Sequence, residues 1–232
     1  MANITLYHGS ENVIQKPIFH AGNPKNDYGY GFYCTENIEL AKEWASSEEK
    51  DGFANQYTLN MNGLTVLNLS DGKYNILNWL AILLQNRTFN ITADIAIDAK
   101  AYISENFLVQ YEQFDIIRGY RADDSYFSFA NAFLNNTISL QKLNKAMYLG
   151  KLGEQIVLKS KKAFSRIKYG SSFAADRSVY YPKKMNRDSA ARKAFFEMRS
   201  SAVSAANDIF VMDILRGGFK NDDPRIPSVL FE

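Results

Sequence analysis

Short apolar stretches of strand type lie near both ends of the chain, whereas apolar residues in the middle recur with the period of a helix. The strand-type stretches are rich in β-branched and aromatic residues and are bounded by Gly, Pro, Asn or Asp. They predict strands at residues 4–7, 31–34, 56–61, 64–69, 114–120, 153–160 and 164–169.

Two of these stretches, residues 56–61 and 64–69, flank the dipeptide Asn62-Gly63. Asn-Gly between apolar runs is the strongest short signal for a β-hairpin, because both residues tolerate the positive φ of a tight turn. We therefore expect these two strands to pair antiparallel.

Helical spacing of apolar residues covers most of the remaining chain. Cap residues precede two of the segments, with Thr35 to Asn37 before the first and Asp123-Asp124 before an aromatic one, and Gly217-Gly218 forms the last stop. The predicted helices are residues 38–45, two between 71 and 106, 126–134, 140–149 and 189–215, whereas residues 12–30 are predicted to be an irregular loop.

Strands at both ends around a helical middle, without a βαβ rhythm, predict an α+β fold with a mainly antiparallel sheet. The 232 residues are enough for one sizeable core. We expect one domain at residues 1–170 and a helical C-terminal extension at residues 171–232 that packs on it.

Composition narrows the choice of function classes. With 46% hydrophobic and 14% aromatic residues the chain should fold, and a net charge of only +2 gives no overall sign of a nucleic-acid or membrane partner. Residues 159–199, however, hold twelve Lys or Arg against three Asp or Glu. This segment is either a solvated basic face or a surface for an acidic or phosphate-bearing partner.

Targeting and metal signals are missing from the sequence. The longest apolar run, residues 76–84, is far shorter than the roughly 20 residues of a membrane helix, and no signal peptide begins the chain. We expect a cytoplasmic protein without a membrane partner. The single Cys34 excludes an intramolecular disulfide framework, and His8 and His20 lack the spacing of a zinc motif, so we expect no metal.

Common catalytic motifs are also absent. The chain has no phosphate-binding G-x-x-x-x-G-K-[ST] loop and no G-x-S-x-G elbow, and Gly29-Tyr30-Gly31 lacks the third glycine of a dinucleotide fingerprint. Cys34 and His8 offer a thiol pair, but a lone Cys between aromatics in a strand is typical of packing.

Three stretches remain that carry chemistry: Leu6 to Ser10 (LYHGS), Tyr28 to Tyr33 (YGYGFY) and Gly153 to Val157 (GEQIV). In this order they resemble the motif blocks of the His-Tyr-Glu class of ADP-ribosyltransferases, to which diphtheria toxin and the poly-ADP-ribose polymerases belong. They are still more similar to an uncharacterised bacterial family with HGS, G-x-GFY-x-T and DI-x-x-G-x-x-ADD blocks. The resemblance covers about residues 4–169 and implies a split, mainly antiparallel sheet.

The resemblance implies a role for each matching residue. His8 would hydrogen-bond the adenosine-side ribose of NAD, and the Gly9 backbone, next to Ser10, would bond the nicotinamide carboxamide. Tyr33 would stack on the nicotinamide, with Trp44 as the second aromatic, although Trp44 also suits a core position. Glu154 would be the catalytic glutamate.

These roles agree chemically with NAD as substrate. The nicotinamide of NAD is a cationic ring, which aromatic faces attract. Cleavage of its bond to ribose passes through an oxocarbenium-like state that a carboxylate stabilises. We therefore expect an NAD-dependent mono-ADP-ribosyltransferase that modifies a protein or nucleic-acid acceptor. We expect it to be a bacterial toxin of a toxin–antitoxin or phage-defence system, with an antitoxin protein as a further partner.

Two alternatives stay open at this stage. Leu152 stands where arginine-modifying relatives carry the first glutamate of an E-x-E pair, and Gln155 follows Glu154 directly. A shift of one residue on a strand turns a side chain to the opposite face, so the register of residues 154 and 155 decides whether a carboxylate is available. If no carboxylate is available, we expect a non-catalytic module that binds NAD or ADP-ribose. If the carboxylate is available but water is the acceptor, the chain is an NAD glycohydrolase.

Overall fold

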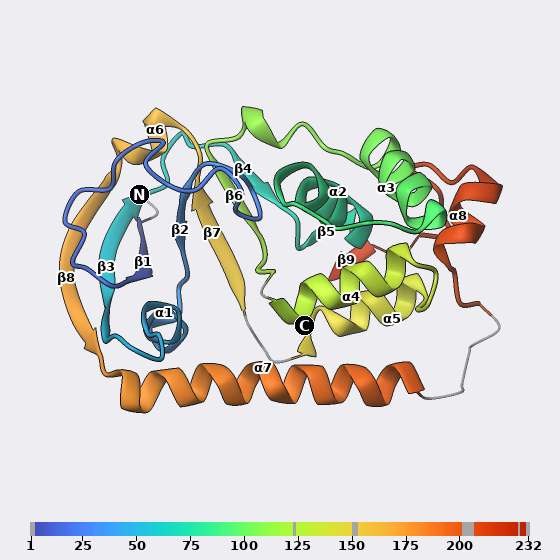
Figure 1. Cartoon of the computed structure of the whole chain (residues 1–232). Coiled ribbons are helices and arrows are strands. Elements are labelled where there is room, and N and C mark those ends of the chain that lie inside the picture. The colour runs from blue at the N-terminus through green and yellow to red at the C-terminus, as the bar shows by residue number, and fades with distance from the viewer. Residues whose placement is uncertain (1–2, 123, 150–152, 201–206, 227, 231–232) are drawn as a thin grey trace. The chain divides into compact units, whose positions relative to one another are not determined.

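The computed structural model describes residues 3–122, 124–149, 153–200, 207–226 and 228–230, and it confirms the α+β class (Figure 1). Contacts within the chain define two compact units of three segments each. The first unit comprises Met1–Asn68, Tyr111–Arg121 and Leu152–Asp188, and the second comprises Leu69–Gln110, Ala122–Lys151 and Ser189–Glu232. The boundary expected at residue 170 falls inside a strand of the first unit.

The first unit is built on two sheets. One has the order β1-β3-β8 and is antiparallel throughout, and the other has the order β2-β7-β6-β4 with a parallel pair only between β4 and β6. The strands are β1 (Asn3–Ser10), β2 (Phe32–Cys34), β3 (Gly52–Asn60), β4 (Val66–Asn68), β6 (Ile116–Tyr120), β7 (Glu154–Leu158) and β8 (Ile167–Ala175).

The two sheets meet at a single antiparallel bridge between Tyr7 and Thr35. Each of these residues donates its amide to the other's carbonyl, at 2.8 and 2.9 Å. The predicted strands at residues 4–7, 31–34, 114–120 and 153–160 are present in this unit, whereas the strand predicted at residues 164–169 begins later, at Ile167. Pairing within the two sheets is mainly antiparallel, as the sequence predicts.

The predicted hairpin across Asn62-Gly63 is wrong. The chain does turn there, with Gly63 at a φ of 68°, but β3 already pairs with β1 on one side and β8 on the other. β3 thus has no free edge, and β4 instead pairs in parallel with β6, Val66 lying opposite Ile116. The turn sequence Asn62-Gly63 carries no information about β8, which is distant in sequence and pairs with the edge of β3 that the hairpin would need.

The inner faces of both sheets share a hydrophobic core. Alternating positions of each strand supply it, as expected for sheets that bury one face. The fully buried members include Leu6, Tyr57 and Leu59 from one sheet and Cys34 and Leu158 from the other.

Helix α1 (Ile38–Ala45) follows β2 and packs against β1 and β3 of the first unit. Its N-cap is Asn37, whose Oδ1 accepts the amides of Glu39 and Leu40 at 2.9 and 3.3 Å, rather than Thr35. Because β1 has a glycine at position 9, the helix approaches the strand closely: a Cβ on Gly9 would lie 2.1 Å from the carbonyl oxygen of Ala41.

Replacing Gly9 by alanine should destabilise the protein by about 2 kcal/mol, since the added methyl meets the helix backbone, which cannot turn away as a side chain would. Urea unfolding of Gly9→Ala measures this. Gly170→Ala is the matched control, because a Cβ there meets nothing closer than 3.4 Å. Equal stability of the two variants would contradict the close approach of α1 to β1.

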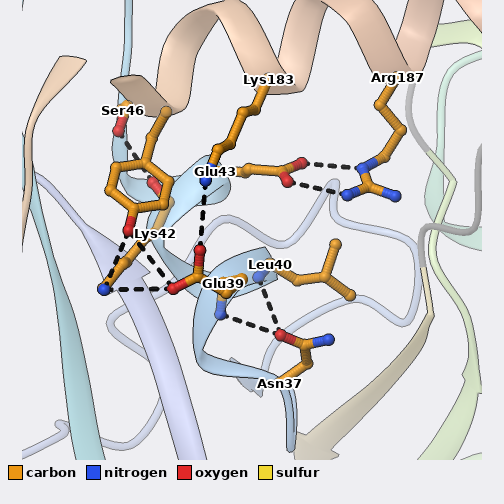
Figure 2. A network of polar contacts seen from close by, with 9 residues as sticks. Asn37, Glu39, Leu40, Lys42, Glu43, Ser46, Lys183 and Arg187 are labelled. Atoms are coloured by element: carbon orange, nitrogen blue, oxygen red, sulfur yellow. Dashed lines mark hydrogen bonds and ion pairs between the residues drawn. The ribbon is translucent and has the colours of Figure 1, made fainter. Parts of the chain in front are cut away.

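Polar contacts tie the first half of α7 (Arg177–Ser200) to α1, as Figure 2 shows. The guanidinium of Arg187 donates to both carboxylate oxygens of Glu43, with distances of 2.9 and 2.8 Å, and the Glu43 side chain is only 5% exposed. Lys183 reaches Glu39 at 3.4 Å, with both side chains half exposed. The bidentate pair is therefore the buried part of this network.

The second unit is largely helical. Asn75 forms a capping box at the start of α2, its Oδ1 accepting the amides of Leu77 and Asn78. Gly218, at a φ of 63°, ends α8 as the sequence predicts. The elements are β5 (Asp71–Asn75), α2 (Ile76–Asn86), α3 (Asp94–Asn106), α4 (Asp124–Leu134), α5 (Leu140–Ala146), α8 (Val211–Gly217) and β9 (Ser228–Leu230).

Two helix predictions change in detail. Residues 71–75 form a strand that pairs with β9, rather than the start of a helix. The single helix expected at residues 189–215 is instead α7, which begins at Arg177, and the separate α8. Two residues named in the sequence predictions, Asp123 and Leu152, lie outside the described residues, as do residues 201–206 of the predicted helix at 189–215.

Candidate functional site

His8 lies near the end of β1 and is fixed by two contacts with β2. Its Nδ1 is 2.7 Å from the carbonyl oxygen of Tyr33, and its ring stacks on Phe32 with centroids 4.3 Å apart. A carbonyl can only accept, so Nδ1–H is the donor. Burial lowers the pKa of His8 below its ordinary value, although the bond to Tyr33 opposes the shift. The imidazole is therefore neutral at pH 7, and Nε2 is left as an acceptor.

Gly9 lies two residues beyond the isolated bridge that joins Tyr7 of β1 to Thr35, which directly follows β2. Tyr7 directs its amide and carbonyl toward β2, and backbone groups alternate sides along a strand, so those of Gly9 point the same way. Within the described part of the chain the two strands nevertheless make no backbone hydrogen bond beyond the Tyr7–Thr35 bridge. The amide and the carbonyl of Gly9 thus point away from β3, on the side of β1 that faces β2, beside His8.

The register of β7 separates Glu154 from Gln155. Cys34 lies opposite Ile156 and Phe32 opposite Leu158, so Glu154 shares their face, which is also the face of Phe32 on which His8 stacks. Gln155 points to the other face, where it is 4% exposed and donates to Asp27 Oδ2 at 3.1 Å. The residue on the face of His8 is therefore the carboxylate.

Arg118, which no sequence motif indicates, forms an ion pair with Glu154. Arg118 on β6 lies opposite Ile156, so its side chain is on the same face as Glu154. Its Nε is 2.5 Å from Glu154 Oε2 and its Nη2 is 2.7 Å from Glu36 Oε2. The Glu154 side chain remains 21% exposed. Only the register of β6 against β7 brings Arg118 to Glu154, because the two residues are 36 positions apart in sequence.

Tyr33 and Trp44 lie on the opposite face from His8. Tyr33 is opposite Val157, and its hydroxyl donates to the Gly29 carbonyl at 2.7 Å and accepts from the Tyr28 amide at 3.0 Å. Trp44 is on α1, which packs on the Gly9 side of β1. The assignment of Tyr33 and Trp44 as a stacking pair stays a prediction.

Trp44 already contacts a cation. The Arg121 guanidinium carbon is 4.6 Å from the centroid of the indole ring, within the range of a cation–π interaction. The indole Nε1 is buried and has no hydrogen-bond partner among the described residues. The ring thus lies in a position that suits a positive charge.

Ser10 and the Gly-aromatic loop have structural partners. The hydroxyl of Ser10 donates to the Asn12 carbonyl at 2.7 Å and accepts from Asn55 Nδ2 at 2.9 Å. Tyr28 is completely buried, and its hydroxyl donates to the Tyr120 carbonyl at 2.6 Å, so this ring is a core residue of the loop. Tyr30, in contrast, is 40% exposed.

Cys34 is completely buried, and burial raises the pKa of its thiol far above the ordinary value. The thiolate is the reactive form, so the native thiol should react with iodoacetamide at pH 8 at least about 100-fold more slowly than the thiol in urea-unfolded protein. Mass spectrometry of the alkylated chain measures both rates. Comparable alkylation rates in native and unfolded protein would instead support a Cys34–His8 nucleophile.

Metal and membrane features are absent from the described part of the chain. No group of three or more His, Cys, Asp or Glu side chains there is arranged to hold a metal ion. No described helix combines the length and the apolar character that crossing a membrane requires.

Comparison with known proteins gives a family. A family model described as a protein of unknown function, DUF3990, matches residues 4–169, which span both sheets of the first unit. No curated protein and no solved structure matches the chain.

Proposed function

We propose that this chain, which belongs to the DUF3990 family of proteins of unknown function, is an NAD-dependent mono-ADP-ribosyltransferase. One observation carries the proposal: an isolated bridge joins Tyr7 of β1 to Thr35, directly after β2, and the amide and carbonyl of Gly9, two residues further along β1, point away from β3 beside His8. A carboxamide has one donor and one acceptor side, which suits an amide and a carbonyl of one residue.

His8 and Glu154 support the same reading. A neutral His8 accepts a ribose hydroxyl at Nε2 while Nδ1 holds it on β2. Glu154 lies on the same face of the sheet, in line with a role on the ribose that carries the nicotinamide.

In the proposed reaction the bond between the ribose anomeric carbon and the nicotinamide nitrogen breaks, and nicotinamide leaves with the electron pair. The anomeric carbon becomes oxocarbenium-like, and the Glu154 carboxylate stabilises the developing positive charge. An oxygen or nitrogen of the acceptor then bonds to this carbon, and its proton passes to Glu154 or to water. Arg118 keeps the carboxylate oriented, and Tyr33 and Trp44 are the proposed stacking partners of the cationic ring.

A non-catalytic NAD-binding module is the second candidate, because Arg118 already neutralises Glu154 at 2.5 Å. A carboxylate that stays in this ion pair has less charge to offer a transition state. Calorimetry that shows NAD binding without nicotinamide release would favour this candidate.

Transfer itself is tested with NAD that carries radiophosphate in its adenylate half. The purified protein should label a macromolecule in a bacterial lysate, and treatment of the product with nuclease or protease identifies the acceptor class. Free ADP-ribose without labelled product would make the chain a glycohydrolase. Absence of both products from folded protein would overturn the proposal.

The biological setting is part of the proposal. We further propose that the chain is the toxin of a toxin–antitoxin or phage-defence system, in which modification of an essential macromolecule would stop growth. An antitoxin protein would then bind it, and co-expression of that partner should remove the growth defect that the chain alone causes.

A further inference from the structure

A stack of three rings lies on the loop between β1 and β2. Phe19 and His20 stack with centroids 3.9 Å apart and an interplanar angle of 22°, and His20 stacks on Tyr30 at 4.9 Å and 24°. His20 and Tyr30 are both exposed. We call Phe19, His20 and Tyr30 the aromatic ladder, and its exposed rings offer planar apolar surface to a ligand.

The ladder is fixed by contacts at both ends. Lys159, with a side chain only 5% exposed, donates from Nζ to the carbonyl oxygens of Tyr30 at 2.7 Å and Tyr28 at 2.5 Å. At the other end Phe19 meets Phe164 edge to face at 5.4 Å. Since these contacts hold the rings in place, little conformational freedom is lost when a ligand stacks on them.

Basic residues predominate in the segments that form and adjoin the aromatic ladder, although Lys159 and Lys162 pair with Glu112 and Asp115 at 3.8 and 3.5 Å. Residues 12–26 of the loop contain Lys16 and Lys25 and no acidic residue, and residues 159–168 contain five Lys or Arg and no acidic residue. Helix α6 (Lys161–Phe164) lies next to this loop (Figure 1), and Lys161 Nζ is 5.8 Å from the Phe19 ring centroid. Among the described residues no carboxylate pairs with Lys161.

Ring contacts also connect the ladder with His8. Phe164 is 6.2 Å from Phe32, and Phe32 is 4.3 Å from His8. Phe164 thus touches the ladder on one side and the ring under His8 on the other. The aromatic ladder is thus linked to His8 through Phe164 and Phe32.

We propose that the aromatic ladder and Lys161 bind single-stranded nucleic acid, which is thereby presented as the acceptor of ADP-ribose. Only the role as acceptor rests on the proposed function. The bases of a single strand expose flat faces that stack on aromatic side chains, and its phosphates are attracted to lysine side chains. A duplex hides its base faces, and an acidic peptide offers charge without the planar rings.

Fluorescence anisotropy without NAD tests the binding directly, with labelled oligouridine, oligothymidine and a hairpin duplex as separate probes. Both single strands should bind, more tightly than the duplex, and a stronger signal for either one identifies RNA or DNA. Tyr30→Ala should weaken single-strand binding about tenfold, and Tyr30→Phe should restore it because the ring is kept. Phe196→Ala, which removes a 70% exposed ring outside the ladder, should leave binding unchanged.

Salt dependence tests the contribution of charge. Lys161→Gln should reduce the slope of log affinity against log salt by about 0.7, the value for one phosphate contact on a single strand. The proposal is overturned by equal binding of duplex, by an unchanged affinity in Tyr30→Ala, by equal competition from polyglutamate, or by no binding at low salt. Because NAD is absent, failure here leaves the nicotinamide-release assays unaffected, and failure of those assays leaves this binding intact.

Discussion

Replacing Glu154 by glutamine should lower the rate of nicotinamide release from NAD by about 100- to 1,000-fold, the usual cost of one electrostatic group that stabilises a transition state. The substitution keeps the shape of the side chain and removes only its charge. The affinity for NAD should change little, because the proposed role of the carboxylate belongs to the transition state rather than to the bound substrate. Chromatographic measurement of nicotinamide at several NAD concentrations separates kcat from KM.

Glu36→Gln is the matched control for this change. Both carboxylates bind Arg118, Glu36 at 2.7 Å and Glu154 at 2.5 Å, so either substitution removes one ion pair of the same arginine. Loss of the ion pair alone would therefore affect both variants equally. Glu36→Gln should lose less than about tenfold, since in the proposed reaction the charge at the reacting ribose comes from Glu154 alone. Equal losses in the two variants would contradict a catalytic role for Glu154.

Replacing Arg187 by alanine should lower the free energy of unfolding by about 3 kcal/mol. The change leaves the Glu43 carboxylate, which is 5% exposed, without the guanidinium that donates two hydrogen bonds to it (Figure 2). Removing one partner of a buried ion pair costs far more than the pair itself contributes, because an unpaired charge remains buried. Thermal unfolding followed by circular dichroism should show a Tm lower by roughly 6–12 °C.

Two further variants separate the buried pair from the rest of the network. Lys183→Ala removes the half-exposed pair with Glu39 and should cost less than about 0.5 kcal/mol. Adding Glu43→Gln to Arg187→Ala should recover part of the lost stability, since the buried group is then neutral. A double variant less stable than Arg187→Ala would show that the cost comes from lost packing.

Much of the first unit is predictable from local pattern. The patterns of apolar and polar residues at 4–7, 31–34 and 153–160 predict the strands found there. The prolines and glycines within residues 12–30 likewise predict the irregular loop. The prediction of a hairpin at Asn62-Gly63 was wrong because strand pairing depends on the whole chain. β1 and β8 pair with the two edges of β3, so β4 cannot pair with it.

The candidate site was predictable only in part, for the same physical reason. His8, Tyr33 and Glu154 stand out through the residues beside them, whereas Arg118 becomes a partner of Glu154 only through the pairing of β6 with β7. The choice between Glu154 and Gln155 depends on the register of β7 against β2. Nothing within residues 153–157 alone gives this register.

Binding of the nicotinamide carboxamide by the backbone of Gly9 can be observed at the amide resonance of this residue. Protein with ¹⁵N-labelled glycine and the Glu154→Gln substitution, which keeps NAD intact, is titrated with NAD and followed by NMR. The Gly9 amide resonance should shift as the carboxamide binds, while the amide resonance of Gly170 on β8 should not change. An unchanged Gly9 resonance at saturating NAD would contradict the proposed binding of NAD at Gly9.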